Sequence, residues 1–174
     1  MSAKINSRQI ISISADIKRA MLDACAKDID IAATILTDAV KNGRKILWCG
    51  NGGSAADAQH MATELMGGLR DHDRPAIASI ALTTDSSFLT AWSNDTDFNT
   101  IFSRQLDALG EAGDVLVAIS TSGNSENILH AITAAKSKGI STILVCGGNG
   151  GEAIKLLDND DIKIILMSEQ PEEK

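Results

Sequence analysis

The chain has 174 residues, of which 44% are hydrophobic and 22% charged, as in a single globular domain. Its formal net charge of −7 and aromatic content of 3% argue against nucleic acid as a partner, because such binding needs concentrated basic and stacking side chains. No apolar run reaches the roughly 18 residues of a membrane span, and the N-terminus lacks a signal-peptide segment, so we expect no membrane contact and a cytoplasmic location.

Residues 1–42 show apolar positions at helical spacing, first through residues 10–22 and then through residues 29–40. Gly43 follows where a helix C-terminus favours glycine. The pattern predicts two amphipathic helices before the first strand. Since such helices cannot bury their apolar faces alone, we expect them to cover a sheet, pack on another subunit, or both.

Strands and helices alternate through residues 43–168, and residues 169–174 form a short tail. Continuous apolar runs predict buried strands at residues 45–49, 76–82, 114–120, 141–146 and 162–167. Helices are expected at residues 54–66, 85–109 with a break near 94–97, 125–138 and 150–157. The prediction is a single α/β domain over residues 1–174, with a doubly wound, five-stranded parallel sheet.

Ligands of such sheets bind beyond the carboxyl ends of the strands, where the strand order reverses. This rule directs attention to residues 50–54, 83–85, 94–95, 120–125 and 147–151. The three cysteines, by contrast, have neither paired nor metal-like spacing. We therefore expect buried free thiols at Cys25, Cys49 and Cys146.

The first strand runs into the turn Gly50-Asn-Gly-Gly-Ser54, which opens a helix. Its glycines allow close backbone approach to a ligand, Ser54 is expected to cap the helix, and the Asn51 amide is suited to sugar hydroxyls. The spacing matches neither a dinucleotide fingerprint nor a P-loop. A ligand-binding turn is predicted, and a tight turn without ligand is the alternative.

The third strand runs into Ser120-Thr-Ser-Gly-Asn-Ser125, where four of six residues carry hydroxyls. Hydroxyls and free backbone N–H groups bind a phosphate monoester without a cation. Ser125 is placed to cap the next helix. The pattern predicts an anion cradle, and an ordinary serine-rich capping loop is the alternative.

His60 and Glu64 stand four residues apart in the helix after the first turn, so both lie on one helix face. Such a pair can bind a metal, or the histidine can hold the glutamate as a proton shuttle; a solvated surface pair is the alternative. Zinc requires three or four protein ligands. His72 and His130 lack convincing metal spacing, so further ligands would have to come from elsewhere.

Several segments resemble one known family, the sugar isomerase (SIS) domains, and within it the sedoheptulose 7-phosphate isomerases, or phosphoheptose isomerases. The resemblance extends from about residue 40 to about residue 167. It implies a flavodoxin-like fold and a homotetramer whose core is built by the N-terminal helices. The segments that carry it are Cys49–Leu65, Ser93–Asp95, Phe102–Gln105, Gly113–Leu116 and Ile119–Ser125.

The resemblance also implies a reaction, in which sedoheptulose 7-phosphate becomes a manno-heptose 7-phosphate through an enediol, at the entry to heptose synthesis for bacterial surface polysaccharide. It implies one zinc ion per subunit, held by His60 and Glu64, with Glu64 also as the catalytic base. The phosphate would be held by Ser120, Thr121, Ser122 and Ser125. The other substrate contacts would be Asn51, Gly52, Gly53, Ser54, Asn94 and Asp95.

One family feature has no counterpart in these 174 residues: a further C-terminal helix whose Gln and His supply the general acid and more metal ligands. We expect turnover to depend on that helix more strongly than binding does. Two other functions fit the same fold, a replication-initiation regulator and a phosphosugar-binding module without turnover. Glu64 and Ser122 argue against the regulator, because the regulator of this family has a non-acidic residue at the first position and an arginine at the second.

Overall fold

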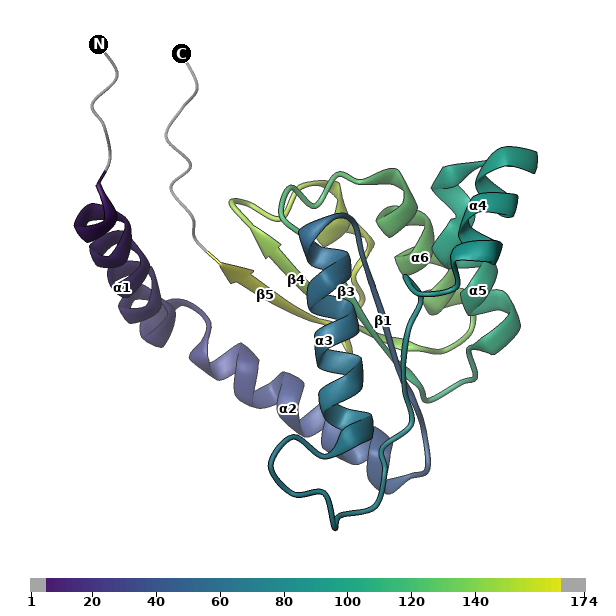
Figure 1. The fold of residues 1–174 in the computed structure, drawn as a ribbon, viewed down its shortest axis with the longest axis horizontal. Helices are drawn as coiled ribbons and strands as arrows, with labels where there is room; N and C mark the ends of the chain where they lie inside the picture. Colours follow the sequence, from purple (N-terminus) through teal and green to yellow (C-terminus); the bar gives the residue numbers. More distant parts are fainter. Residues whose placement is uncertain (1–5, 167–174) are drawn as a thin grey trace.

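A computed structural model describes residues 6–166 and shows a five-stranded parallel sheet with helices on both faces (Figure 1). The strand order is β2-β1-β3-β4-β5, and every pair is parallel. The elements, with η for a 3₁₀ helix, are α1 (Ser7–Ala24), α2 (Ala26–Lys41), β1 (Ile46–Gly50), α3 (Gly53–Gly67), β2 (Ser79–Ala81), α4 (Ser86–Asp95), η1 (Phe98–Thr100), α5 (Ile101–Leu109), β3 (Val115–Ser120), α6 (Glu126–Ser137), β4 (Ser141–Gly147), η2 (Glu152–Leu156) and β5 (Ile162–Leu166).

The strands are apolar throughout because both faces of the sheet are covered. In β1, Ile46 and Trp48 pack into a cluster with α2 and α3, while Leu47 and Cys49 pack into a second cluster with α5 and α6. Every residue of β1 is buried. The predicted doubly wound α/β fold is confirmed.

The strand order reverses between β1 and β3, because the chain leaves β1 toward β2 on one side and leaves β3 toward β4 on the other. Gly50, at the end of β1, pairs in register with Ile119, next to the end of β3. The turns after β1 and β3 therefore begin side by side at one sheet edge, the position at which open α/β sheets bind ligands.

Three predicted boundaries were wrong. The strand expected over residues 76–82 is limited to Ser79–Ala81, because β2 is an edge strand that pairs only with Ile46–Trp48. The short helix expected over residues 150–157 is the 3₁₀ helix η2, which spans only Glu152–Leu156. Helix α3 starts at Gly53 with Gly52 as its N-cap, so Ser54 does not cap it.

Other local predictions were confirmed. Gly43 follows the end of α2 with a φ of 69°, and the helical stretch through residues 85–109 is interrupted between Asp95 and Phe98. Cys25, Cys49 and Cys146 are buried free thiols. Met167 and the tail at residues 169–174 lie outside the described residues.

The two N-terminal helices behave differently. Helix α2 covers the sheet: it contacts β1, β3 and β5, and buries Ala32 and Ala39. Helix α1 begins with a capping box in which Asn6 and Gln9 exchange side chain-to-backbone hydrogen bonds, yet it buries no residue. Figure 1 shows α1 projecting from the body of the molecule. Within residues 6–166, no helix is both long and apolar enough to cross a membrane.

Candidate functional site

The turns after β1 and β3 are joined by a pair of amide side chains. Asn51 Nδ2 donates to Asn127 Oδ1, and Asn127 Nδ2 donates to Asn51 Oδ1, each over 2.8 Å. Asn127 lies in the first turn of α6 and is only 2% exposed. The two predicted binding turns are therefore held next to each other at one edge of the sheet.

Glycine is required in the β1 turn by the backbone itself. Gly52 has a φ of 55°, a conformation that L residues rarely adopt. A Cβ on Gly50 would lie 2.6 Å from the Ser54 carbonyl oxygen. The tight turn leaves Gly52 and Gly53 exposed and the Asn51 side chain partly exposed at the edge of the sheet.

Two serine hydroxyls in the β3 turn are already used as acceptors. Ser120, 5% exposed, accepts from the Gly123 N–H over 3.2 Å, and Ser122 accepts from the Asn124 N–H over 3.2 Å. This use leaves each O–H hydrogen available to donate to a ligand. Thr121 is exposed in the same turn. No residue from 120 to 127 is basic, so an anion bound here would be held by neutral donors.

Ser125 is the N-cap of α6, as predicted, although its side chain makes no capping hydrogen bond. The free N–H groups and partial positive charge of the first turn of α6 therefore face the β3 turn. A 12-residue helix provides a full N-terminal dipole. Together with the hydroxyls, it gives the turn the donor set of an anion cradle.

The segment after β4, to which the rule on strand ends also directs attention, supports the β3 turn. The Gly147 N–H donates to the Thr121 carbonyl oxygen, and the Ala153 N–H donates to the Gly123 carbonyl oxygen. The Glu152 N–H donates to Asn124 Oδ1 over 2.9 Å. A Cβ on Gly123 would collide with the Gly150 carbonyl oxygen. The two turns are thus packed backbone against backbone.

A cavity of about 560 Å³ opens beside the β1 turn. Of the predicted residues, Asn51, Gly52 and Asn94 line it, whereas Gly53, Ser54, His60, Glu64, Asp95 and residues 120–125 do not. Asn94 Nδ2 donates to Asp95 Oδ1 over 2.8 Å at the end of α4. The complete wall comprises Gly50, Asn51, Gly52, Ala55, Thr83, Leu89, Thr90, Ser93, Asn94, Phe98, Ile101 and Phe102.

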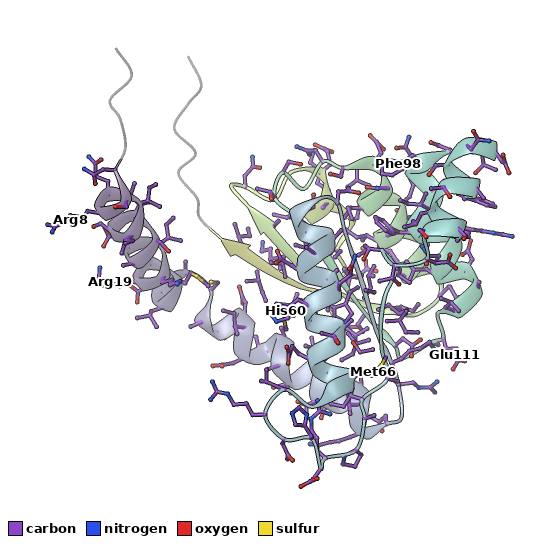
Figure 2. The ribbon with its side chains drawn as sticks, viewed as in Figure 1. Arg8, Arg19, His60, Met66, Phe98 and Glu111 are labelled. Carbon is purple, nitrogen blue, oxygen red and sulfur yellow. The ribbon has the colours of Figure 1, made fainter. Side chains whose placement is uncertain are left out.

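His60 and Glu64 form the predicted pair on α3, with 3.3 Å between His60 Nε2 and Glu64 Oε1. The His60 side chain is 69% exposed and that of Glu64 is 31% exposed. Figure 2 shows His60 on α3 and Phe98, from the cavity wall, near the helices on the other side of the sheet. The pair is therefore separate from the cavity of its own chain.

The pair supplies two of the three or four ligands that zinc requires. Among residues 6–166, no group of three or more His, Cys, Asp or Glu side chains could hold a metal ion. His72 contacts the Gly67 carbonyl oxygen through Nδ1, and His130 is exposed on α6. The donors described here do not by themselves make a zinc site.

Two features of the site escaped the sequence prediction. The apolar wall formed by Leu89, Phe98 and Ile101 was read only as helical pattern, although Leu89 and Ser93, four apart, mark one face of α4. Asn127, just beyond the β3 turn, was not among the predicted site residues. Its partner is 76 residues away, so no local pattern indicates the pairing.

Comparison with known proteins decides the family. The SIS domain model matches residues 11–147. A phosphoheptose isomerase of Campylobacter concisus is 54% identical over 140 residues, which cover 80% of this chain and 72% of that protein. One of Aromatoleum aromaticum is 48% identical over 157 residues, covering 90% and 79%. The chain belongs to the SIS domain family, among its phosphoheptose isomerases.

Solved structures of phosphoheptose isomerases share the fold over nearly the whole chain. The one from Francisella tularensis has a TM-score of 0.91 and 35% identity, with 94% of this chain and 85% of that chain covered. The one from Neisseria gonorrhoeae has a TM-score of 0.83 and 40% identity, with 94% and 87% covered. The predicted family and fold are thus confirmed.

Proposed function

We propose that this chain isomerises sedoheptulose 7-phosphate to D-glycero-D-manno-heptose 7-phosphate in the cytoplasm, as the first step of heptose synthesis for bacterial surface polysaccharide. The relatives named phosphoheptose isomerases support the reaction. The observation that carries the proposal is the adjacency of the two turns at the point where the strand order reverses, joined through Asn51 and Asn127. One turn offers anion donors and the other a side-chain amide for a sugar.

The phosphate is assigned to the β3 turn. Ser120 and Ser122 donate from hydroxyls whose oxygens are already hydrogen-bonded, Thr121 and Ser125 add two more hydroxyls, and the first turn of α6 adds backbone N–H groups. Hydrogen bonds to a charged group are stronger than neutral ones. A dianion can therefore be bound here without lysine or arginine.

The sugar is assigned to the β1 turn and the cavity beside it. The volume of about 560 Å³ lies within the usual range for small-molecule sites, roughly 300–1,000 Å³. Asn51 and Gly52 line the cavity on one side and Asn94 lines it from α4. Gly53 and Ser54, which continue the turn into α3, and Asp95, which accepts a hydrogen bond from Asn94, are proposed as further contacts from outside the cavity wall. Amide groups there are suited to the hydroxyls of a sugar chain.

Glu64 is proposed as the base that moves a proton between C1 and C2 through an enediol. A carboxylate performs this step when it reaches the carbon-bound proton. Glu64 stands eleven residues beyond Gly53, roughly 16 Å along α3 by the helical rise, and outside the cavity wall. We infer that it serves the sugar bound to a second copy, in the proposed homotetramer.

Zinc is proposed at the same place, with His60 and Glu64 as two ligands and the remaining ligands from outside residues 6–166. When bound, zinc would polarise the sugar carbonyl and stabilise negative charge on its oxygen. His60 would meanwhile hold the Glu64 carboxylate in one orientation.

The test is to incubate the purified protein with sedoheptulose 7-phosphate, with and without added zinc, and follow the aldose product. Turnover that Glu64→Gln abolishes while leaving phosphosugar binding intact would support the proposal. Binding that stabilises the protein without any turnover would instead indicate a phosphosugar-binding module.

A further inference from the structure

The Asn51–Asn127 pair is a partly buried, reciprocal contact between two elements that hold different parts of the proposed substrate. Each amide donates one hydrogen bond and accepts another, both 2.8 Å long. An amide group has two N–H hydrogens and two carbonyl lone pairs. The pair therefore uses half of the capacity of Asn51 and leaves one N–H and one lone pair of Asn51 for a ligand.

Reciprocity couples the orientations of the two amides. Turning one amide by 180° would place two donors opposite each other and two acceptors opposite each other, so each side chain holds the other in its orientation. Asn127 is itself fixed, because it is 2% exposed and stands in the first turn of a helix whose neighbours Ile128, Ala131 and Ile132 are fully buried.

Asn127 does not line the cavity, whereas Asn51 does. A buried polar side chain away from a ligand usually stabilises the fold only. Here, however, its two hydrogen bonds go entirely to a residue of the binding turn. The β1 turn has no other side chain bound to the β3–α6 segment among the contacts of residues 6–166.

We propose that Asn127 is a positioning residue: it orients the Asn51 amide toward the sugar and holds the sugar-binding turn at a set distance from the phosphate-binding turn. The inference rests on the proposed function, because it takes the β3 turn as the phosphate site. It predicts that loss of Asn127 weakens sugar recognition and leaves phosphate recognition in place.

The test is isothermal titration of the full chain with two probes, inorganic phosphate and sedoheptulose 7-phosphate. Asn127→Leu keeps the size of the side chain and removes both hydrogen bonds. We expect the Kd for sedoheptulose 7-phosphate to rise about tenfold or more and the Kd for phosphate to change less than about twofold. Thr142→Val, at a buried polar position at the opposite end of β4, controls for lost stability alone.

Asn127→Asp provides a second readout that remains informative should the leucine variant not fold. A protonated carboxyl group both donates and accepts, as the amide does, whereas an ionised one only accepts. At each pH, the ratio of the affinities for sedoheptulose 7-phosphate and for phosphate is compared between this variant and wild type. As the pH falls from about 7.5 to about 5, the ratio of the variant should rise toward that of wild type. An unchanged preference across this range would overturn the inference.

The outcomes distinguish the proposed function from the positioning role of Asn127. Failure of the wild-type protein to bind either probe contradicts the proposed function itself. Wild-type binding with equal losses for both probes in Asn127→Leu means that Asn127 only stabilises the fold. Wild-type-like binding of both probes by that variant means that Asn51 needs no partner. Either of the last two results overturns the inference alone.

Discussion

Neutral hydroxyls, rather than cations, are the residues on which the proposed phosphate site depends. Ser120 and Ser122 each accept a backbone N–H, which orients the hydroxyl and frees its hydrogen for a ligand. This choice suits a chain with a net charge of −7, because recognition does not require a basic patch that would also attract other anions.

The position of the two turns could be predicted from sequence, because each follows a continuous apolar run that forms a buried parallel strand. The pairing of Asn51 with Asn127 could not, since it joins positions 76 residues apart. The wall residues Leu89 and Phe98 also could not be assigned, because apolar helix positions look the same whether they face a core or a cavity.

Cys49 allows a test at the residue scale. Burial raises its thiol pKa to about 12 from 9.0, so almost no thiolate forms in the folded protein at pH 8. We expect iodoacetamide to spare Cys49 in the native protein and to modify it after unfolding, as mass spectrometry of the peptides would show. Rapid modification of Cys49 in the native state would contradict the burial.

The same shift affects stability. Below pH 9 both folded and unfolded states keep the Cys49 proton, so this group adds no pH dependence. Between pH 9 and about 12 the unfolded state releases a proton that the folded state retains, so the free energy of unfolding falls as pH rises. Denaturant titration of Cys49→Ser beside wild type should show a shallower decline in the variant.

At the element scale, the contact between the β3 turn and the segment after β4 shapes the proposed phosphate site. Sequence analysis located every strand and helix and named residues 147–151, after β4, among five segments at strand ends, but it did not predict what this segment contacts. Its glycines allow backbone contact with Gly123 and Asn124. The length of β2 also depends on a contact far away in the sequence. This edge strand pairs only with β1, and the pairing extends over three residues.

Gly123→Ala tests this contact, with Gly43→Ala as the matched control. Both glycines have similar positive φ values, 66° and 69°, but a Cβ on Gly43 has no atom within 4 Å, whereas one on Gly123 collides with Gly150. Both changes cost about 1 kcal/mol of backbone strain or more. We expect a clearly larger fall in Tm for Gly123→Ala, and equal falls in both variants would contradict the packing.

At the scale of the whole molecule, α1 presents an apolar surface that its own chain does not cover. Ile10, Ile11 and Leu22 are 58%, 68% and 71% exposed, and α1 buries no residue (Figure 1). Exposed apolar faces of this kind mark interaction sites. The sequence predicted that the N-terminal helices would cover the sheet or another subunit, and α2 takes the first role, which leaves α1 for the proposed homotetramer.

Replacing Ile10, Ile11 and Ile13 together by serine should lower the mass of the particle in solution, because the apolar face of α1 would lose its affinity for other copies. Sedimentation equilibrium would measure this mass. Arg19→Ser, on the same helix, is the control and should leave it unchanged. An unaltered mass in the triple variant would show that α1 is not part of the interface.

If each site draws residues from two subunits, two variants that are inactive alone should complement each other in mixed oligomers. Glu64→Gln lacks the base, and Ser120→Ala with Ser122→Ala lacks the phosphate hydroxyls, so each should be inactive alone. Oligomers unfolded and refolded together should regain up to about a quarter of wild-type turnover, if each site draws from two copies of a symmetric assembly. No recovery in mixed oligomers would place Glu64 at the site of its own chain.

The central claim is that a phosphate ester is bound by the hydroxyl turn after β3. Isothermal titration of sedoheptulose 7-phosphate into wild type and into Ser120→Ala with Ser122→Ala tests it most directly, with Ser137→Ala as a control far from the site. Each hydrogen bond to a charged group contributes about 1.5–3 kcal/mol, so the loss of both should weaken binding by the double variant roughly 100- to 10,000-fold. An affinity equal to that of wild type would contradict the account.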